Sequence, residues 1–346
     1  MKLLLAICFL LSAAHHVECR HHPKRQPDYK LFVFGDSFVD AGNTPKSELS
    51  RRSRAWYYPY GSSDSDRDDS ATGRYSNGPV QSDFLANILG LDASPPPYRL
   101  RKANKIDPSG ENFAVAGAGV FDSPEGSPTL GHQVVNQFGR LVDLKIVKDE
   151  DLQKSVALIS ITSGSDYPEI TARTSPFEMM GVCENVTDAI VDGVRRLQKM
   201  GVRNVLVNTM PPIGCSPYRS SSNNHSGCEA SGNAVASMHN TILKQKLRGE
   251  DDVLLLDLNT VFTSLIEQET ESSLSLQFKH KLTACCDTED PTGYCGQEDD
   301  GGNPMYTVCL KPDTHFYWDY MHPTKAGWKA VMSLLESSIK DFLSTS

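Results

Sequence analysis

The sequence predicts an α/β fold in which five parallel strands form a sheet that is covered by helices on both faces. Five short apolar runs, rich in β-branched residues, alternate along the chain with segments of helical spacing. Strands that are separated by helices form parallel sheets, and a strand buried on both faces is a nearly continuous apolar run. Because no linker and no internal repeat interrupts the alternation, we expect one domain over residues 20–346.

The predicted strands and helices follow one another in regular order. The strands are apolar runs at residues 30–34, 112–115, 156–161, 205–208 and 253–257. The helices have apolar residues three and four positions apart, at residues 79–89, 130–147, 177–200, 229–248 and 324–343. Two further segments, 44–72 and the Cys-, Gly- and Asp-rich 284–314, are expected to be loops that shape a binding pocket.

Residues 1–19 have the features of a secretory signal peptide. Lys2 is followed by an apolar run, 3–14, that is too short to span a bilayer but suits a signal-peptide core. Val17 and Cys19 would lie just before the cleavage site. The alternative is a buried amino-terminal strand or helix. We expect a secreted, extracellular protein with no membrane span.

The cysteines agree with an oxidising compartment. Two of the nine, Cys8 and Cys19, would leave with the signal peptide, and the remaining seven can form at most three disulfides. The spacing within 285–309 does not match that of zinc ligands, so we expect no metal site there. Two N-glycosylation sequons, at Asn185 and Asn224, fit the same compartment.

The net charge excludes some classes of partner. The chain has 34 Lys and Arg against 43 Asp and Glu, a net charge of −9. Binding to nucleic acid or to anionic membranes needs clustered basic residues, so neither is expected. The charge gives no attraction to acidic glycans, and it does not separate a sugar ester from a lipid as substrate. The sequence does not indicate an oligomeric state.

Ser37 is the first candidate for a catalytic residue. It follows the first predicted strand in the tripeptide Gly35-Asp36-Ser37, where Gly35 permits a tight bend. A serine at such a turn can expose its hydroxyl above the sheet, and its own N–H can face a developing oxyanion. The alternative is an ordinary turn with a helix N-cap. Asp40 and Asn43 are expected to brace the turn.

Asp319 and His322 form the second candidate group. A carboxylate three residues before an imidazole can hold its N–H and stabilise the protonated form. His322 would then act as general base toward Ser37. In parallel sheets, sites lie at the carboxyl ends of the strands, where we expect these residues to meet. The alternative is a helix start with Asp319 as the cap and His322 on the surface.

Five segments together resemble the GDSL esterase/lipase family of SGNH hydrolases, and most closely its secreted plant branch. They are residues 32–43, 73–78, 110–119, 211–215 and 319–324. The resemblance implies a three-layer α/β/α, flavodoxin-like fold and hydrolysis of esters through an acyl-serine, without a metal or organic cofactor. It also implies Ser37 as nucleophile, His322 as base, Asp319 as its partner, and the backbone N–H groups of Ser37 and Gly117 as oxyanion donors.

The sequence departs from the family pattern at two positions. Phe38 replaces a leucine, a change that packing usually absorbs. Ser165 replaces the asparagine that supplies the third oxyanion donor, and its hydroxyl reaches less far than an amide. Loss of one such donor lowers kcat by about 10²–10³. Ser165 would therefore donate directly or through a water, or the enzyme is slow, or the site is inactive.

Three functions follow from these residues. The leading prediction is a secreted serine esterase that acts on a lipid acyl ester or on an acetylated cell-wall polysaccharide. The first alternative is an acyltransferase that uses the same Ser37, His322 and Asp319 to pass the acyl group to an alcohol. The second is a non-catalytic, glycan-binding relative, which Ser165 favours and the intact triad opposes.

Overall fold

The computed structural model describes most of the chain after residue 28. The described residues are 29–102, 104–123, 126–162, 166–167, 175–267, 273–290 and 292–345. The predicted signal peptide, residues 1–19, lies outside them.

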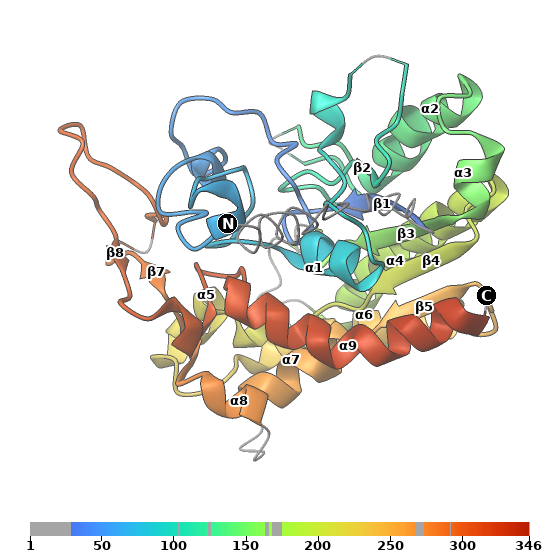
Figure 1. Cartoon of the computed structure of the whole chain (residues 1–346). Helices are drawn as coiled ribbons and strands as arrows, with labels where there is room; N and C mark the ends of the chain where they lie inside the picture. The colour runs from blue at the N-terminus through green and yellow to red at the C-terminus, as the bar shows by residue number, and fades with distance from the viewer. Residues whose placement is uncertain are drawn as a thin grey trace, which may run out of the picture.

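Five parallel strands form the central sheet, as predicted (Figure 1). They are β1 (Lys30–Gly35), β2 (Gly110–Asn112), β3 (Ser155–Ser160), β4 (Asn204–Asn208) and β5 (Val253–Leu256). Their order across the sheet is β2-β1-β3-β4-β5, which is the flavodoxin-like order. In this order the chain changes direction between β1 and β3, so the carboxyl ends of these two strands frame the expected binding site.

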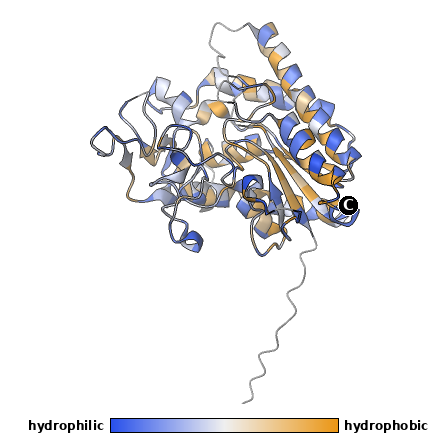
Figure 2. Cartoon of the chain, turned by 90° about the horizontal axis from the view of Figure 1, so that it is seen from above, coloured by the Kyte–Doolittle hydropathy of each residue, from blue (hydrophilic) through white to orange (hydrophobic). Residues whose placement is uncertain are grey.

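Helices cover both faces of the sheet because successive strand residues point to opposite sides. Leu31 and Val33 belong to one buried cluster, and Phe32 and Phe34 belong to the other. The first cluster is completed by α1 (Gln81–Ile88), α7 (Leu258–Ile266) and α9 (Lys325–Thr345), and the second by the π-helix η4 (His132–Gly139), α2 (Arg140–Asp143), α4 (Pro176–Lys199) and α6 (Ala230–Lys246). Figure 2 shows hydrophobic residues concentrated on the strands and on the sides of the helices that face them.

Several boundaries differ from those that the sequence predicts. The strand expected at 112–115 ends at Asn112, because the next ladder bond to β1 would use the N–H of Gly35, and this N–H donates to the Gln133 side chain at 2.7 Å instead. The single helix expected at 130–147 ends at Asp143, shortly before Lys145 adopts a left-handed φ of 55°.

Short elements outside the central sheet complete the fold. The sequence did not predict the helices α3 (Asp149–Gln153), α5 (Pro217–Ser220), α7 and α8 (Ser273–Gln277). It also did not predict the paired strands β6 (His280–Ala284) and β9 (His315–Tyr317), or β7 (Cys286–Asp287) and β8 (Thr307–Val308). No helix of the described residues is long and apolar enough to cross a membrane.

Three disulfides form, and one cysteine of the described residues is free, as the count predicted. The bridges are Cys215–Cys228, Cys285–Cys309 and Cys286–Cys295. The free thiol belongs to Cys183 and is buried in α4. Two bridges lie in the segment expected to be a loop, where Cys285, Cys286 and Cys295 share a small buried cluster with residues of 44–75.

Asp83 in α1 forms a buried ion pair whose strength depends on pH. Its carboxylate lies 2.9 Å from Arg74 and 3.2 Å from Arg67. Burial alone would raise the pKa of Asp83, but the two cations outweigh it and lower the pKa to about 2. Because the folded-state pKa lies below the unfolded value, the carboxylate stabilises the fold above about pH 4, and this contribution is lost as pH falls toward 2.

We expect Asp83→Asn to lower the free energy of unfolding by about 3–5 kcal/mol at neutral pH, because Arg74 then loses its buried partner. The difference from wild type should narrow between pH 4 and pH 2, which urea unfolding at pH 7 and pH 2.5 would measure. Asp149→Asn, at an exposed pair with Lys145, is the control and should change stability by less than about 1 kcal/mol. A deficit of equal size at both pH values would contradict this account.

Candidate active site

The turn after β1 is held in place by the end of β3. Gly35 has a φ of +143°, and a Cβ there would lie 2.1 Å from the carbonyl oxygen of Ser160, so only glycine allows the two strands to approach. The buried Asp36 carboxylate then accepts hydrogen bonds from the N–H groups of Thr162, at 2.7 Å, and Phe38, at 3.1 Å. Ser37 is thereby fixed at the carboxyl end of the sheet.

Asp40 braces the same turn, as predicted. Its buried carboxylate accepts hydrogen bonds from the N–H groups of Gly42, Asn43 and Ala116, at 2.7, 2.6 and 2.9 Å. Burial raises the pKa of Asp40, and these hydrogen bonds oppose the increase. The bond to Ala116 ties the turn that carries Ser37 to the loop that carries Gly117.

Three of the predicted site residues meet at this edge of the sheet. Ser37 Oγ lies 2.8 Å from His322 Nε2, and His322 Nδ1 lies 2.7 Å from Asp319 Oδ1. All three are buried, with exposed fractions of 5% for Ser37, 1% for His322 and 0% for Asp319. A hydroxyl, an imidazole and a carboxylate thus form one hydrogen-bonded line, which is the arrangement that activates a serine as a nucleophile.

The segment around Asp319 is a tight bend and does not begin a helix. Asp319 Oδ1 accepts hydrogen bonds from the N–H groups of Met321 and His322, at 3.0 and 2.9 Å. The last helix begins only at Lys325. The alternative of a helix cap with a surface histidine is therefore wrong, because the bend turns the His322 ring inward onto Ser37.

Two residues that the sequence did not indicate contact the Asp319 carboxylate. Tyr60 donates its hydroxyl to Asp319 Oδ2 at 2.7 Å, and Arg54 Nη2 lies 3.4 Å from the same oxygen. Arg54 also donates to the Tyr60 hydroxyl at 2.8 Å. Burial would raise the pKa of Asp319, but His322 and Arg54 outweigh it and hold the pKa well below its usual range.

Aromatic side chains surround the imidazole and the guanidinium. The rings of Tyr75, Phe38 and Tyr320 lie with their centroids 5.0, 5.8 and 6.0 Å from that of His322. Tyr75 and Tyr320 also pack on the Arg54 guanidinium, at 4.9 and 5.1 Å. Tyr75 belongs to a motif segment, 73–78, whereas Arg54 lies in the segment 44–72, which has no clear periodicity, so no sequence signal indicated its position.

Backbone N–H groups near Ser37 are available to a ligand. Within the described residues, no acceptor is hydrogen-bonded to the N–H of Ser37 or of Gly117. Gly117 has a left-handed φ of +77°, which glycine adopts readily. Ser165, the third expected donor, lies outside the described residues. Asp166 accepts hydrogen bonds from the N–H of Val120, at 2.9 and 3.0 Å, and therefore braces the loop after Gly117.

Two groups of potential metal ligands occur in the described residues, and neither offers thiolates. They are Cys285, Cys309 and His315, and Cys215, Cys228 and Glu267. In each group both sulfurs are joined in a disulfide. The expectation that the cysteine-rich segment is not a zinc site agrees with this pairing.

Comparison with known proteins adds to the geometry. The family model described as GDSL-like Lipase/Acylhydrolase matches residues 31–335. Two GDSL esterase/lipases of Arabidopsis thaliana are similar: one is 33% identical over 92% of this chain and 89% of its own length, and another is 31% identical over 93% and 97%. Among solved structures, Est24, a carbohydrate acetylesterase from Sinorhizobium meliloti, aligns at 13% identity over 66% of this chain and 84% of its own, with a TM-score of 0.33.

Proposed function

Because the chain belongs to the GDSL-like lipase/acylhydrolase family, it is an ester-bond hydrolase, and we propose that Ser37 is its nucleophile, with His322 as general base and Asp319 as the partner of His322. The observation that carries this proposal is the 2.8 Å separation between Ser37 Oγ and His322 Nε2. In the described residues, this hydroxyl is joined through an imidazole to a fully buried carboxylate.

The reaction proceeds in two steps on these groups. His322 Nε2 takes the proton of Ser37 as Oγ attacks the ester carbonyl, and Asp319 stabilises the imidazolium. The tetrahedral intermediate then collapses, His322 protonates the departing alkoxide, and an acyl-Ser37 ester remains. Water then attacks the acyl carbonyl as it gives a proton to His322. The bond from the carbonyl carbon to Oγ breaks, Oγ takes the proton back from His322, and the carboxylic acid leaves the free serine.

The oxyanion of each intermediate would be bound by backbone N–H groups of Ser37 and Gly117. Both are without an acceptor among the described residues, which leaves them free to donate. Donors placed in advance at the developing charge need no reorganisation during the reaction. The hydroxyl of Ser165 is the proposed third donor, on the strength of its place in the family motif alone.

We also propose that the protein is secreted and carries a glycan at Asn224. The three disulfides support an oxidising compartment. Asn224 is exposed, in a turn with a left-handed φ of 56°, and surface loops suit glycosylation. Asn185 lies instead within α4, and the Thr187 hydroxyl of its sequon is buried and donates to the carbonyl of Cys183 at 2.7 Å. Asn224 is therefore the better acceptor.

A fluorophosphonate probe tests the nucleophile directly. We expect the probe to add one phosphonyl group to the peptide that contains Ser37, read by peptide mass spectrometry, and none in Ser37→Ala. Ser155 is the first residue of β3, and its buried hydroxyl donates to the carbonyl of Leu152. The control variant Ser155→Ala should therefore be labelled like wild type. Labelling at another residue, or none in the folded protein, would contradict the assignment.

The wild-type protein, without the probe, also distinguishes hydrolysis from acyl transfer. The wild-type protein is given an ester substrate with and without a large excess of an acceptor alcohol, and the products are separated by chromatography. Free acid as the main product in both reactions is the expected result. A new ester that dominates when the alcohol is present would show that the acyl-Ser37 intermediate is passed to the alcohol.

A further inference from the structure

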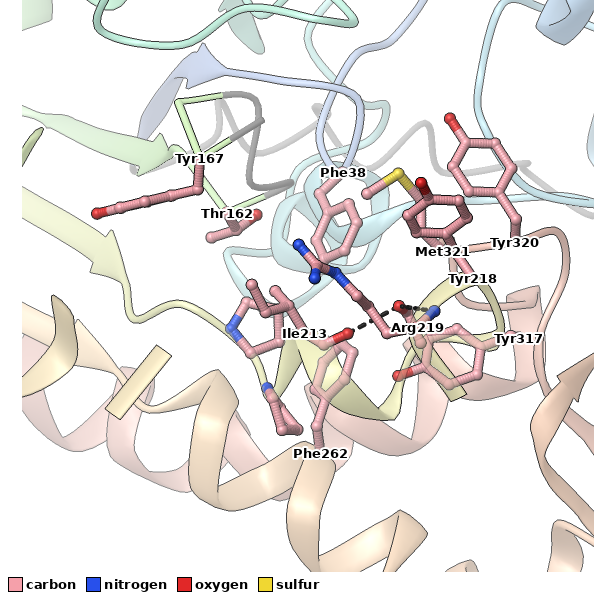
Figure 3. Close-up of a pocket in the computed structure, with 13 residues that line it drawn as sticks. Phe38, Thr162, Tyr167, Ile213, Tyr218, Arg219, Phe262, Tyr317, Tyr320 and Met321 are labelled. Atoms are coloured by element: carbon pink, nitrogen blue, oxygen red, sulfur yellow. Dashed lines mark hydrogen bonds between the residues drawn. The ribbon is translucent and has the colours of Figure 1, made fainter. Parts of the chain in front are cut away.

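A cavity of about 270 Å³ lies beside the proposed triad (Figure 3). Its walls come from segments that follow the carboxyl ends of strands, with Phe38 after β1 and Ile213 after β4. Met321 adds a wall from the bend that carries the histidine. The rings of Phe38 and Tyr320, which both line the cavity, lie with their centroids 5.8 and 6.0 Å from that of His322, so the cavity adjoins the imidazole.

The side chains around the cavity are mainly apolar. Phe38 and Phe262 are buried, and Figure 3 shows them lining the cavity together with Ile213. Arg219 is the one charged residue among the described residues that line it, and its Nη1 lies 3.8 Å from the carboxylate of Glu229. Such a cavity gains free energy by taking in hydrocarbon in place of water.

We infer that this cavity holds the acyl chain of the ester. Its volume equals that of roughly nine waters of about 30 Å³ each, which suits a straight chain of about six to eight carbons. An acetyl group offers a single methyl and would leave most of the cavity unfilled. This inference rests on the proposed function, and it selects the acyl-lipid class of substrate over acetylated polysaccharide.

The two-step reaction explains why the acyl chain occupies the cavity and the alcohol does not. The alcohol leaves after the first step, and water must then reach the acyl-Ser37 carbonyl by the path that the alcohol vacates. The acyl group stays through both steps, so an apolar cavity can hold it without excluding the attacking water. Its lining by Phe38, one residue from Ser37, suits a chain that remains attached to Oγ.

A chain-length series on the full protein tests the inference. p-Nitrophenyl esters of two, four, six, eight and twelve carbons share one leaving group, so differences in kcat/KM report the acyl chain. Each added methylene that enters the cavity is expected to raise kcat/KM about fourfold, up to six or eight carbons. A matched series of acetates with alcohols of increasing length should stay flat.

Two substitutions at Ile213 change the cavity in opposite directions. Ile213→Trp fills it and should lower the ratio of kcat/KM for hexanoate to that for acetate by about tenfold or more. Ile213→Ala enlarges the cavity and should move the optimum to longer chains. Val135→Trp, at an exposed position of η4, adds the same bulk away from the cavity and should leave the profile unchanged.

Different outcomes separate the inference from the proposed function. A wild-type enzyme that hydrolyses acetate as well as hexanoate, or whose rate rises along the alcohol series, overturns the assignment of the cavity. So does an equal loss for all chain lengths in Ile213→Trp together with an unchanged optimum in Ile213→Ala. If no ester is hydrolysed in a manner that depends on Ser37, the proposed function fails instead.

Discussion

Replacing Ser37 with alanine is expected to lower kcat for ester hydrolysis by about 10⁶-fold, the loss seen when a triad nucleophile is removed. The substitution removes the oxygen that lies 2.8 Å from His322 Nε2, and no other described hydroxyl is hydrogen-bonded to this nitrogen. The residual rate should be that of binding and oxyanion stabilisation acting on water alone. Initial rates with a p-nitrophenyl ester measure the loss, with Ser155→Ala as the matched control.

The fold should survive this change. Ser37 is small and packs at a turn that is held mainly by Asp36 and Asp40, whose hydrogen bonds do not involve the serine hydroxyl. Thermal unfolding of Ser37→Ala should therefore stay close to that of wild type. If the variant unfolds normally but retains more than a few per cent of the activity, Ser37 is not the nucleophile.

Replacing Asp319 with asparagine is expected to lower kcat by about 10⁴-fold with little change in KM. The carboxylate accepts a hydrogen bond from His322 Nδ1 at 2.7 Å, which places the remaining lone pair of the ring on Nε2, toward Ser37. An amide can turn its NH₂ group toward Nδ1 and so favour the wrong tautomer. It also cannot stabilise the imidazolium as an anion does.

The hydrogen bond from Tyr60 to Asp319 allows the action of the carboxylate to be weakened without removing the charge. Tyr60→Phe removes one donor, 2.7 Å from Asp319 Oδ2, but leaves Arg54 beside the carboxylate. A hydrogen bond to a charged group contributes about 1.5–3 kcal/mol, so we expect a loss in kcat of roughly tenfold to a hundredfold, with KM preserved. Tyr29→Phe, which removes a hydroxyl bonded to Leu343 at 3.4 Å, is the control.

Active-site titration distinguishes positioning from loss of structure in these variants. If Tyr60 positions Asp319, the number of titratable sites is unchanged and the rate at each site falls. If Tyr60 only supports the fold, the number of sites falls and each remaining site turns over normally. A normal rate per site in both Asp319→Asn and Tyr60→Phe would rule out the proposed action of the Asp319 carboxylate on His322.

The strands and long helices could be predicted because their signals are local. The apolar runs at β1, β3 and β4 are buried on both faces, so every residue reports the same environment. The helix α4 begins at Pro176 after a Ser175 cap, which is again readable from neighbouring residues. Boundaries failed where a distant side chain intervened, as when Gln133 takes the N–H of Gly35 that would extend the pairing of β1 with β2.

The sequence by itself determined the sheet, the upper limit of three disulfides and the choice of Ser37, Asp319 and His322 as the proposed catalytic residues, because each depends on residue type and spacing along the chain. Only the tertiary structure decided the disulfide pairing, the inward turn of His322 and the placing of Arg54 and Tyr60 behind Asp319. Arg54 and Asp319 are 265 residues apart. Contacts over such distances arise from how loops pack on a finished sheet, and a loop without periodicity carries no local signal of the partner that it will meet.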